Sequence, residues 1–79
     1  MFISHTSHYA DVIELARKRN AQSVSIQNYY TFCLFTTPND AEKFLHDVES
    51  KGMSTAFGVN PNRYPDKYWE VAVRNYGLK

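Results

Sequence analysis

Cysteine, glycine and long apolar runs are scarce in this sequence, and each scarcity excludes a class of function. The single cysteine, Cys33, cannot form a disulfide within the chain, which predicts a reducing, cytoplasmic location. No apolar stretch approaches the length that crosses a bilayer, and the start of the chain has no long apolar segment, so we expect neither membrane insertion nor secretion. The three glycines are scattered, so there is no glycine-rich loop to hold a phosphate group.

A strong excess of one charge is missing as well. The net charge is +1, whereas proteins that bind DNA mainly through its phosphates are strongly basic. With 79 residues, of which 43% are hydrophobic and 15% aromatic, the chain has enough apolar side chains for one packed core. We therefore expect a single domain over residues 1–79, whose partner is not dictated by overall charge.

The stretch from residue 35 to residue 52 is typical of a helix with both ends marked. Thr37 stands three residues before Asp40, which is a capping-box spacing. Pro38 falls at the first helical position, where its missing N–H does no harm, and Gly52 is placed to end the helix. The apolar residues of the stretch share one helical face: Ala41, Phe44, Leu45 and Val48.

Another helix is predicted from about residue 7 to residue 20. Its apolar positions recur at helical spacing: Tyr9, Val12, Ile13 and Ala16. Acidic residues precede basic ones along it, as the helix dipole favours. For residues 1–3, which are apolar, the sequence leaves two alternatives open: an edge strand, or a piece that packs against the domain.

The β-rich stretch from residue 23 to residue 35 allows two layouts, which side-chain alternation separates. A single strand would place these residues on one face: Val24, Ile26, Tyr30, Phe32 and Leu34. A hairpin turning at Gln27 and Asn28 would group a less apolar set: Val24, Ile26, Tyr29, Thr31, Cys33 and Phe35. Because Gln-Asn is also a poor dipeptide for a tight turn, we predict one strand, bulged near Asn28.

Two further strands are predicted at residues 53–59 and 68–75, joined by a wide loop, 60–67, that contains two prolines. The element order predicts an α+β fold, a two-layer α/β sandwich with a split β-α-β (ferredoxin-like) arrangement. In it, strand 68–75 is the middle one of three, and both helices cover one face. The expected helix-facing residues are Val24, Ile26, Phe32, Leu34, Phe57, Trp69, Val71 and Val73, with Phe32, Trp69 and Phe44 in one interior. The expected open face carries Tyr29, Thr31, Cys33, Phe35, Ala56, Tyr68, Glu70, Ala72, Arg74 and Tyr76.

Two segments, DAEKFLHDVESKGM and KYWEVAVRN, together with the elements around them, resemble the family of the regulator of ribonuclease E activity B. The pattern runs from the first predicted helix to Asn75 and so covers most of the chain. The resemblance implies a small non-catalytic protein that binds and inhibits a nucleic-acid-processing enzyme. The chain departs from that family in charge, because members of the family look strongly acidic and this chain is close to neutral.

The polar residues do not form a catalytic or metal-binding pattern. His5 and His8 are spaced to share one helical face, but His46 belongs to the other helix and Cys33 is alone, so a complete metal site is not predicted. Nothing near Cys33 resembles an activated thiol or a strained nucleophile turn. We therefore predict no enzymatic activity, no metal and no cofactor.

The predicted function is binding: inhibition or regulation of a nucleic-acid-processing enzyme or complex by direct protein contact. One alternative is a phage-encoded antagonist of host defence of the anti-CRISPR kind. Another is a small domain that stacks bases of RNA or single-stranded nucleic acid on its aromatic side chains, although the ribonucleoprotein signature motifs are absent.

Tyrosine and arginine are enriched at protein interfaces, and the predicted partner-binding residues follow from this. They are Tyr29, Asn60, Asn62, Arg63, Tyr64, Lys67, Tyr68, Arg74 and Tyr76. A secondary basic patch is predicted at Arg17, Lys18 and Arg19, which is small for phosphate-driven binding. A free edge strand would offer a route to a homodimer.

Overall fold

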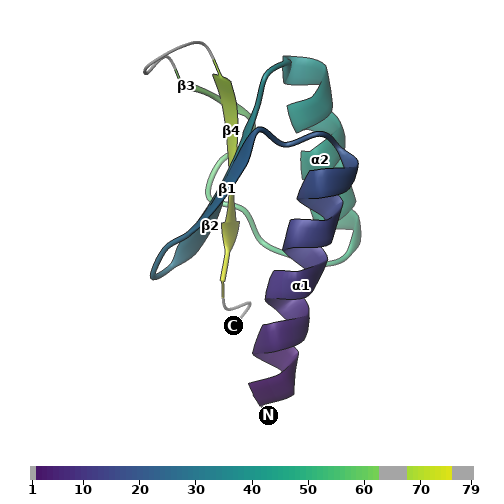
Figure 1. The fold of residues 1–79 in the computed structure, drawn as a ribbon, viewed down its shortest axis with the longest axis vertical. Helices are drawn as coiled ribbons and strands as arrows, with labels where there is room; N and C mark the ends of the chain where they lie inside the picture. The colour runs from purple at the N-terminus through teal and green to yellow at the C-terminus, as the bar shows by residue number, and fades with distance from the viewer. Residues whose placement is uncertain (1, 63–67, 76–79) are drawn as a thin grey trace.

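The structure is a computed structural model that describes residues 2–62 and 68–75. Its elements, in chain order, are α1 (Phe2–Lys18), β1 (Ser23–Ile26), β2 (Tyr30–Phe35), α2 (Pro38–Ser50), β3 (Asn60–Asn62) and β4 (Tyr68–Arg74). They form two layers, with the sheet on one side and both helices on the other, and the first turns of α1 extend past the sheet (Figure 1). The predicted α+β class and the two helices on one face are confirmed, whereas residues 2 and 3 belong to α1 and not to an edge strand.

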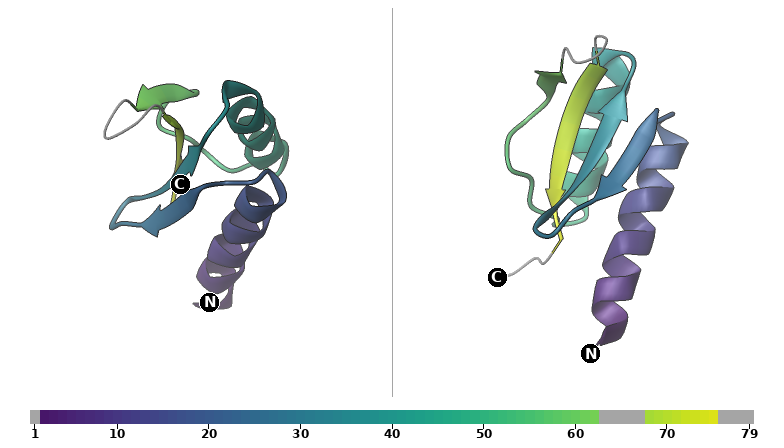
Figure 2. Two further views of the ribbon diagram at one scale, coloured as in Figure 1. Left: turned by 45° about the horizontal axis from the view of Figure 1, so that its top comes forward. Right: turned by 60° about the vertical axis from the view of Figure 1, so that its left-hand side comes forward.

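The sheet has four strands in the order β1-β2-β4-β3, and every pair is antiparallel. The prediction of three strands is therefore wrong. β4 lies between β2 and β3, with β1 at the opposite edge (Figure 2). β3 falls inside the segment predicted to be a loop, because an edge strand can accommodate Pro61 without losing a hydrogen bond to a further neighbour.

The predicted strand at residues 53–59 is reduced to a short bridge beside β4. Thr55 pairs with Val73, and the Ala56 N–H donates to the Ala72 carbonyl at 3.0 Å. The backbone then leaves β4 before β3 rejoins it at Asn60. Phe57 lies in this excursion and is 40% exposed, so its predicted place in the core is wrong.

β1 and β2 form a hairpin, so the predicted single strand is also wrong. Val24 pairs with Cys33 and Ile26 with Thr31, and the Gln27 N–H donates to the Tyr30 carbonyl at 2.9 Å. The turn residues are thus Asn28 and Tyr29. This layout sends alternate side chains of β2 to the opposite faces from those expected, because a shift of one residue exchanges the two faces of a strand.

The core lies between the sheet and the two helices. Its buried members are Val12, Ala16, Cys33, Phe35, Ala41, Phe44, Val48, Val71 and Val73, with Trp69 partly buried against them. The rings of Phe35 and Phe44 lie 5.1 Å apart between centroids. Phe35 therefore takes the place predicted for Phe32, which lies on the other face. The predicted inward direction of Trp69, Val71 and Val73 is confirmed.

Both helices end with the same backbone motif. Asn20 and Gly52 have positive φ angles of 65° and 83°, in the left-handed region that Gly and Asn tolerate best. The next residue in each case donates its N–H back into the helix, Ala21 to Ala16 at 2.9 Å and Met53 to Val48 at 3.0 Å. Thr37 caps the start of α2 by accepting the Asp40 N–H at 3.2 Å. The predicted ends near Asn20 and at Gly52 are confirmed.

Asn75 joins the end of β4 to the turn of the β1–β2 hairpin. Its side-chain oxygen accepts the Thr31 hydroxyl at 2.6 Å, and its side-chain N–H₂ group donates to the backbone carbonyls of Gln27 at 2.6 Å and Asn28 at 3.2 Å. Asn75 and Thr31 are each only 1% exposed. The network therefore satisfies buried polar groups that would otherwise be costly to remove from water.

We predict that Asn75→Ala destabilises the domain by about 2–4 kcal/mol, because it leaves the buried Thr31 hydroxyl and the Gln27 carbonyl without their partner. Urea unfolding followed by circular dichroism measures the loss. Asn28→Ala is the matched control, since only the backbone carbonyl of Asn28 takes part in the network. Equal stabilities of the two variants would contradict the role given to Asn75.

Candidate functional site: the uncovered face of the sheet

The face of the sheet that points away from the helices is covered by no described element (Figure 2). We call it the open face and define it by strand register. Its residues are Ser23, Ser25, Tyr30, Phe32, Leu34, Asn60, Tyr68, Glu70, Ala72 and Arg74. Side chains on this face of β2 and β4 are mostly only half buried, which is the burial expected of a layer with solvent on one side.

Aromatic and apolar side chains occupy the middle of the open face. Tyr30 and Phe32 lie two residues apart on β2, with ring centroids separated by 6.2 Å and ring planes inclined by 46°. Ala72 lies opposite Phe32 and is fully buried, so a small residue separates larger ones. The centre of the open face is therefore apolar and partly exposed to solvent.

The charged groups of the open face lie on β4. The guanidinium carbon of Arg74 lies 5.9 Å from the centre of the Tyr30 ring, within the range of a cation–π contact. Glu70 lies opposite Leu34 on one side and Asn60 on the other. Arg74 and Glu70 thus lie at different positions along β4, and together they contribute one positive and one negative charge to the described part of the open face.

A depression of about 470 Å³ lies on the open face near β1. It is lined by Ser23, Ser25, Gln27, Phe32, Leu34 and Glu70. Its apolar side comes from β2, while hydroxyl groups come from β1, an amide from Gln27 just after β1, and a carboxylate from β4. A partner side chain with an apolar stem and a hydrogen-bond donor at its end matches the apolar and polar sides of this depression.

The predicted partner-binding residues are only partly brought together. Tyr68 and Arg74 lie on the open face, Asn60 and Asn62 pair with Glu70 and Tyr68 in β3, and Tyr29 is 74% exposed at the hairpin turn. The other four predicted contacts, Arg63, Tyr64, Lys67 and Tyr76, fall outside the described residues. Thr31, Cys33 and Phe35, predicted for the open face, point to the helices and are buried.

Sequence reasoning missed the β2 residues that dominate the open face. Phe32 and Leu34 are expected in the core, with Tyr30 on the same face of the strand, because large apolar side chains alternate along this stretch. The signal that could have reversed this assignment is Asn75, a polar residue that follows the apolar alternation of β4 and is able to hold a turn through its side chain.

The predicted basic patch is reduced by an ion pair. Arg17 and Lys18 are exposed at the end of α1, but Arg19 bonds Asp47 of α2 through two contacts, Nε to Oδ2 at 2.7 Å and an Nη to Oδ1 at 3.2 Å. This pair raises the pKa of Arg19 and lowers the pKa of Asp47, in both cases mainly through the hydrogen bond between them. Arg19 therefore links the end of α1 to α2.

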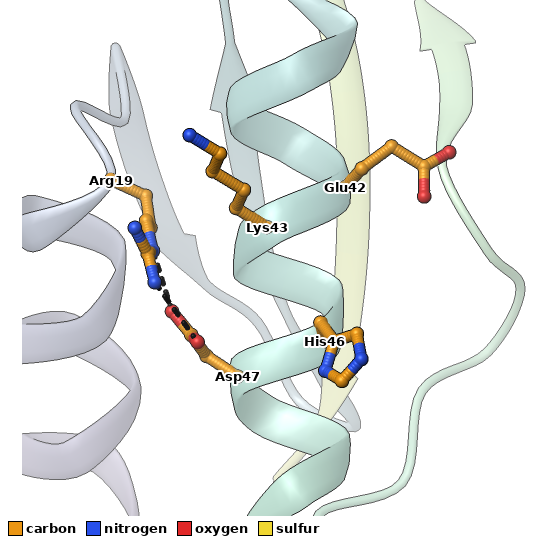
Figure 3. Close-up of a pocket in the computed structure, with 5 residues that line it drawn as sticks. All are labelled: Arg19, Glu42, Lys43, His46 and Asp47. Carbon is orange, nitrogen blue, oxygen red and sulfur yellow. Dashed lines mark hydrogen bonds and ion pairs between the residues drawn. The ribbon is translucent and has the colours of Figure 1, made fainter.

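A second depression, of about 410 Å³, lies around this ion pair and is lined by Arg19, Glu42, Lys43, His46 and Asp47 (Figure 3). Glu42 and His46 point away from α1, whereas Asp47 points toward it (Figure 3). The polar groups do not converge on one point, and two of them already satisfy each other. This depression is a weaker candidate than the open face.

Catalytic chemistry finds no support among the described residues. Cys33 is fully buried, and burial raises the pKa of its thiol to about 12, which disfavours the reactive thiolate. No group of three or more His, Cys, Asp and Glu residues in the described ranges could hold a metal ion. His46 is exposed on α2, while His5 and His8 belong to α1.

Comparison of the chain with protein-family models, with curated proteins and with solved structures finds no match. Within the described ranges, neither helix is long and apolar enough to span a membrane.

We predict that Asp47→Asn lowers the free energy of unfolding at neutral pH. The free energy of unfolding of this variant should also fall less on acidification than that of the wild type. Because the folded-state pKa of Asp47 is lowered, its contribution is complete above the unfolded pKa of about 3.9 and is lost as pH falls toward the folded value. Urea unfolding of both proteins from pH 7 to pH 2.5 should show a difference that shrinks below about pH 4. Glu49→Gln, at an exposed position on α2, is the control and should change little. A difference independent of pH would contradict the ion-pair role.

We also predict that Cys33 is protected from thiol reagents in the native protein. Its zero exposure and raised pKa together slow the reaction, and unfolding should restore the rate of an ordinary cysteine. Reaction with a chromogenic disulfide, with and without denaturant, measures both rates. Rapid labelling without denaturant would show that the thiol is accessible and that the core assignment of β2 is wrong.

Proposed function

We propose that the chain is a non-catalytic binding protein that contacts a partner protein through the open face. The observation that carries this proposal is the uncovered group of Tyr30, Phe32 and Leu34 on a central strand, next to Arg74. Tyrosine and arginine are enriched where protein interfaces gain most of their binding energy. Polar side chains from β1 and β3 flank this group, as in an interface with an apolar centre and a polar rim.

The charges of this face favour a protein over a nucleic acid. Its described residues include one cation, Arg74, and one carboxylate, Glu70. Nucleic-acid affinity rises mainly with the number of phosphates that lysine and arginine neutralise. The neighbouring rings of Tyr30 and Phe32 could accept bases, but the balanced charge of the described face supplies little attraction for the backbone that carries those bases.

The class of partner that we propose is a nucleic-acid-processing enzyme or complex, which the chain would inhibit or regulate in the cytoplasm. This step rests on the resemblance of DAEKFLHDVESKGM and KYWEVAVRN to the family of the regulator of ribonuclease E activity B. A phage-encoded antagonist of host defence would use the same surface on a different target. The buried free Cys33 supports the cytoplasmic assignment, since a reducing compartment keeps such a thiol unpaired.

For the fold, we propose a rearranged split β-α-β unit of the ferredoxin-like kind. β2, α2 and β3 follow one another in the chain, and β4 lies between the two strands. The ferredoxin-like order is β-α-β-β-α-β, and moving its first strand to the end gives the order seen here, α-β-β-α-β-β. This relation accounts for all four strands, β1 included, and supports the ferredoxin-like prediction.

We predict that the double variant Tyr30→Ala, Leu34→Ser weakens partner binding by at least about tenfold, since it removes two of the apolar side chains at the centre of the face. The affinity-tagged chain is used to isolate its partner from a lysate of cells that encode it, with and without nuclease, and affinity is then measured with the purified partner. Phe57→Ser is the control, because Phe57 is an exposed aromatic outside the strands.

The outcomes separate the alternatives. A protein that is retained after nuclease treatment, is lost with the double variant and is kept by the control supports the proposal. Equal retention by the double variant and the control would show that another surface makes the contact. Loss on nuclease treatment, together with salt-sensitive binding of single-stranded oligonucleotides, would show that the chain binds nucleic acid instead.

A further inference from the structure

The two edges of the sheet differ in how well they are protected. β3 carries Pro61, which cannot donate a backbone hydrogen bond to an additional strand. β1 consists of Ser23, Val24, Ser25 and Ile26, with no proline and no charge, and no described segment pairs with its outer side. Edge strands normally carry features that prevent pairing with other chains, and apart from its short length of four residues β1 has neither the proline nor the charge that serves this purpose.

The backbone groups of two β1 residues point outward. The Gln27 N–H donates to the Tyr30 carbonyl, and hydrogen-bonded pairs alternate along an antiparallel ladder, so Ser25 and Ser23 also bond toward β2. Val24 and Ile26 occupy the intervening positions, where the N–H and C=O groups face away from β2. They form a short row of donors and acceptors at the edge of the sheet.

These positions are complementary to a second copy of the same strand. We propose that β1 pairs antiparallel with β1 of another copy, about a twofold axis at Ser25. In that register Val24 lies opposite Ile26 of the second copy and Ile26 opposite its Val24, so the outward-facing groups bond in two reciprocal pairs. A twofold contact requires this reciprocity, which the three-residue stretch Val24–Ile26 provides.

The side-chain contacts that this register would form also favour it. Val24 and Ile26 lie on the helix-facing side of the sheet, where Ile26 is 50% exposed because the core does not reach it. Pairing covers each Ile26 with the Val24 of the other copy. On the open face, Ser25 meets Ser25 of the second copy, and the uncharged strand brings no like charges together. The two four-stranded sheets then become one continuous sheet, with the two open faces on the same side.

The test uses charge at the twofold axis. Ser25→Lys and Ser25→Glu each place like charges directly opposite each other, so each variant alone should be monomeric. An equimolar mixture of the two should recover the dimer, since opposite charges then meet. Ser23→Lys is the matched control, because this exposed serine on the same face is not opposite itself in the proposed register. Analytical ultracentrifugation of the full chain over a concentration series measures the dissociation constants.

We expect a wild-type dimer, a dissociation constant at least about tenfold higher for each Ser25 variant, and near wild-type values for the mixture and for Ser23→Lys. Wild-type protein that stays monomeric up to millimolar concentration would overturn the proposal, as would a dimer that all variants retain. Amide exchange of the wild type gives a check that needs no mutation: the Val24 and Ile26 N–H groups should become protected as concentration rises. Protection of these groups only when another protein is added would show that β1 accepts a strand from that protein instead.

Discussion

The hydrogen bonds of Asn75 are the constraint on which the rest of the molecule depends. They connect the end of β4 with the Gln27 and Asn28 carbonyls and the Thr31 hydroxyl, and so fix where β1 turns into β2. The Thr31 side chain bonds Asn75, and both lie on the buried face, so Cys33 and Phe35, which alternate with Thr31, share that face, and this sets the parity of β2. If β2 slipped by one residue against β4, Tyr30, Phe32 and Leu34 would face α1 and α2, and Thr31, Cys33 and Phe35 would face solvent.

This parity explains how a chain with few chemical motifs obtains a distinct surface. Phe35 and Cys33 fill the interior beside Phe44, which leaves the larger apolar side chains of β2 on the uncovered side. A core that uses a cysteine and a threonine on its central strand gives up some apolar burial. Tyr30 and Phe32, which are not part of the core, instead form the candidate binding surface.

The sequence was sufficient for the parts of the fold that local chemistry determines. Thr37, Pro38 and Gly52 mark the ends of α2, and Asn20 marks the end of α1, because each residue suits a backbone requirement of its own position. The alternation of Trp69, Val71 and Val73 also assigned β4 correctly. These elements depend on neighbouring residues, and so they can be predicted without knowing the tertiary structure.

The rest could not be predicted in this way, because both faces of β2 read as apolar. Tyr30, Phe32 and Leu34 form the more apolar set, whereas the buried set includes Thr31, whose hydroxyl bonds Asn75, a residue distant in the sequence. Pro61 was an equally misleading signal, since a proline excluded from an inner strand is compatible with an edge. The prediction is therefore correct for the faces of β4 and wrong for the faces of β2.

Asn75 also has a consequence for folding kinetics. Its side chain bonds a turn that lies 48 positions earlier in the chain, and β2 and β4 are separated by the whole of α2. The central strand pair can form only after a long loop has closed, which slows folding relative to a protein whose contacts are local. During synthesis on the ribosome, β2 must wait for β4, and its two apolar faces stay available to chaperones until then.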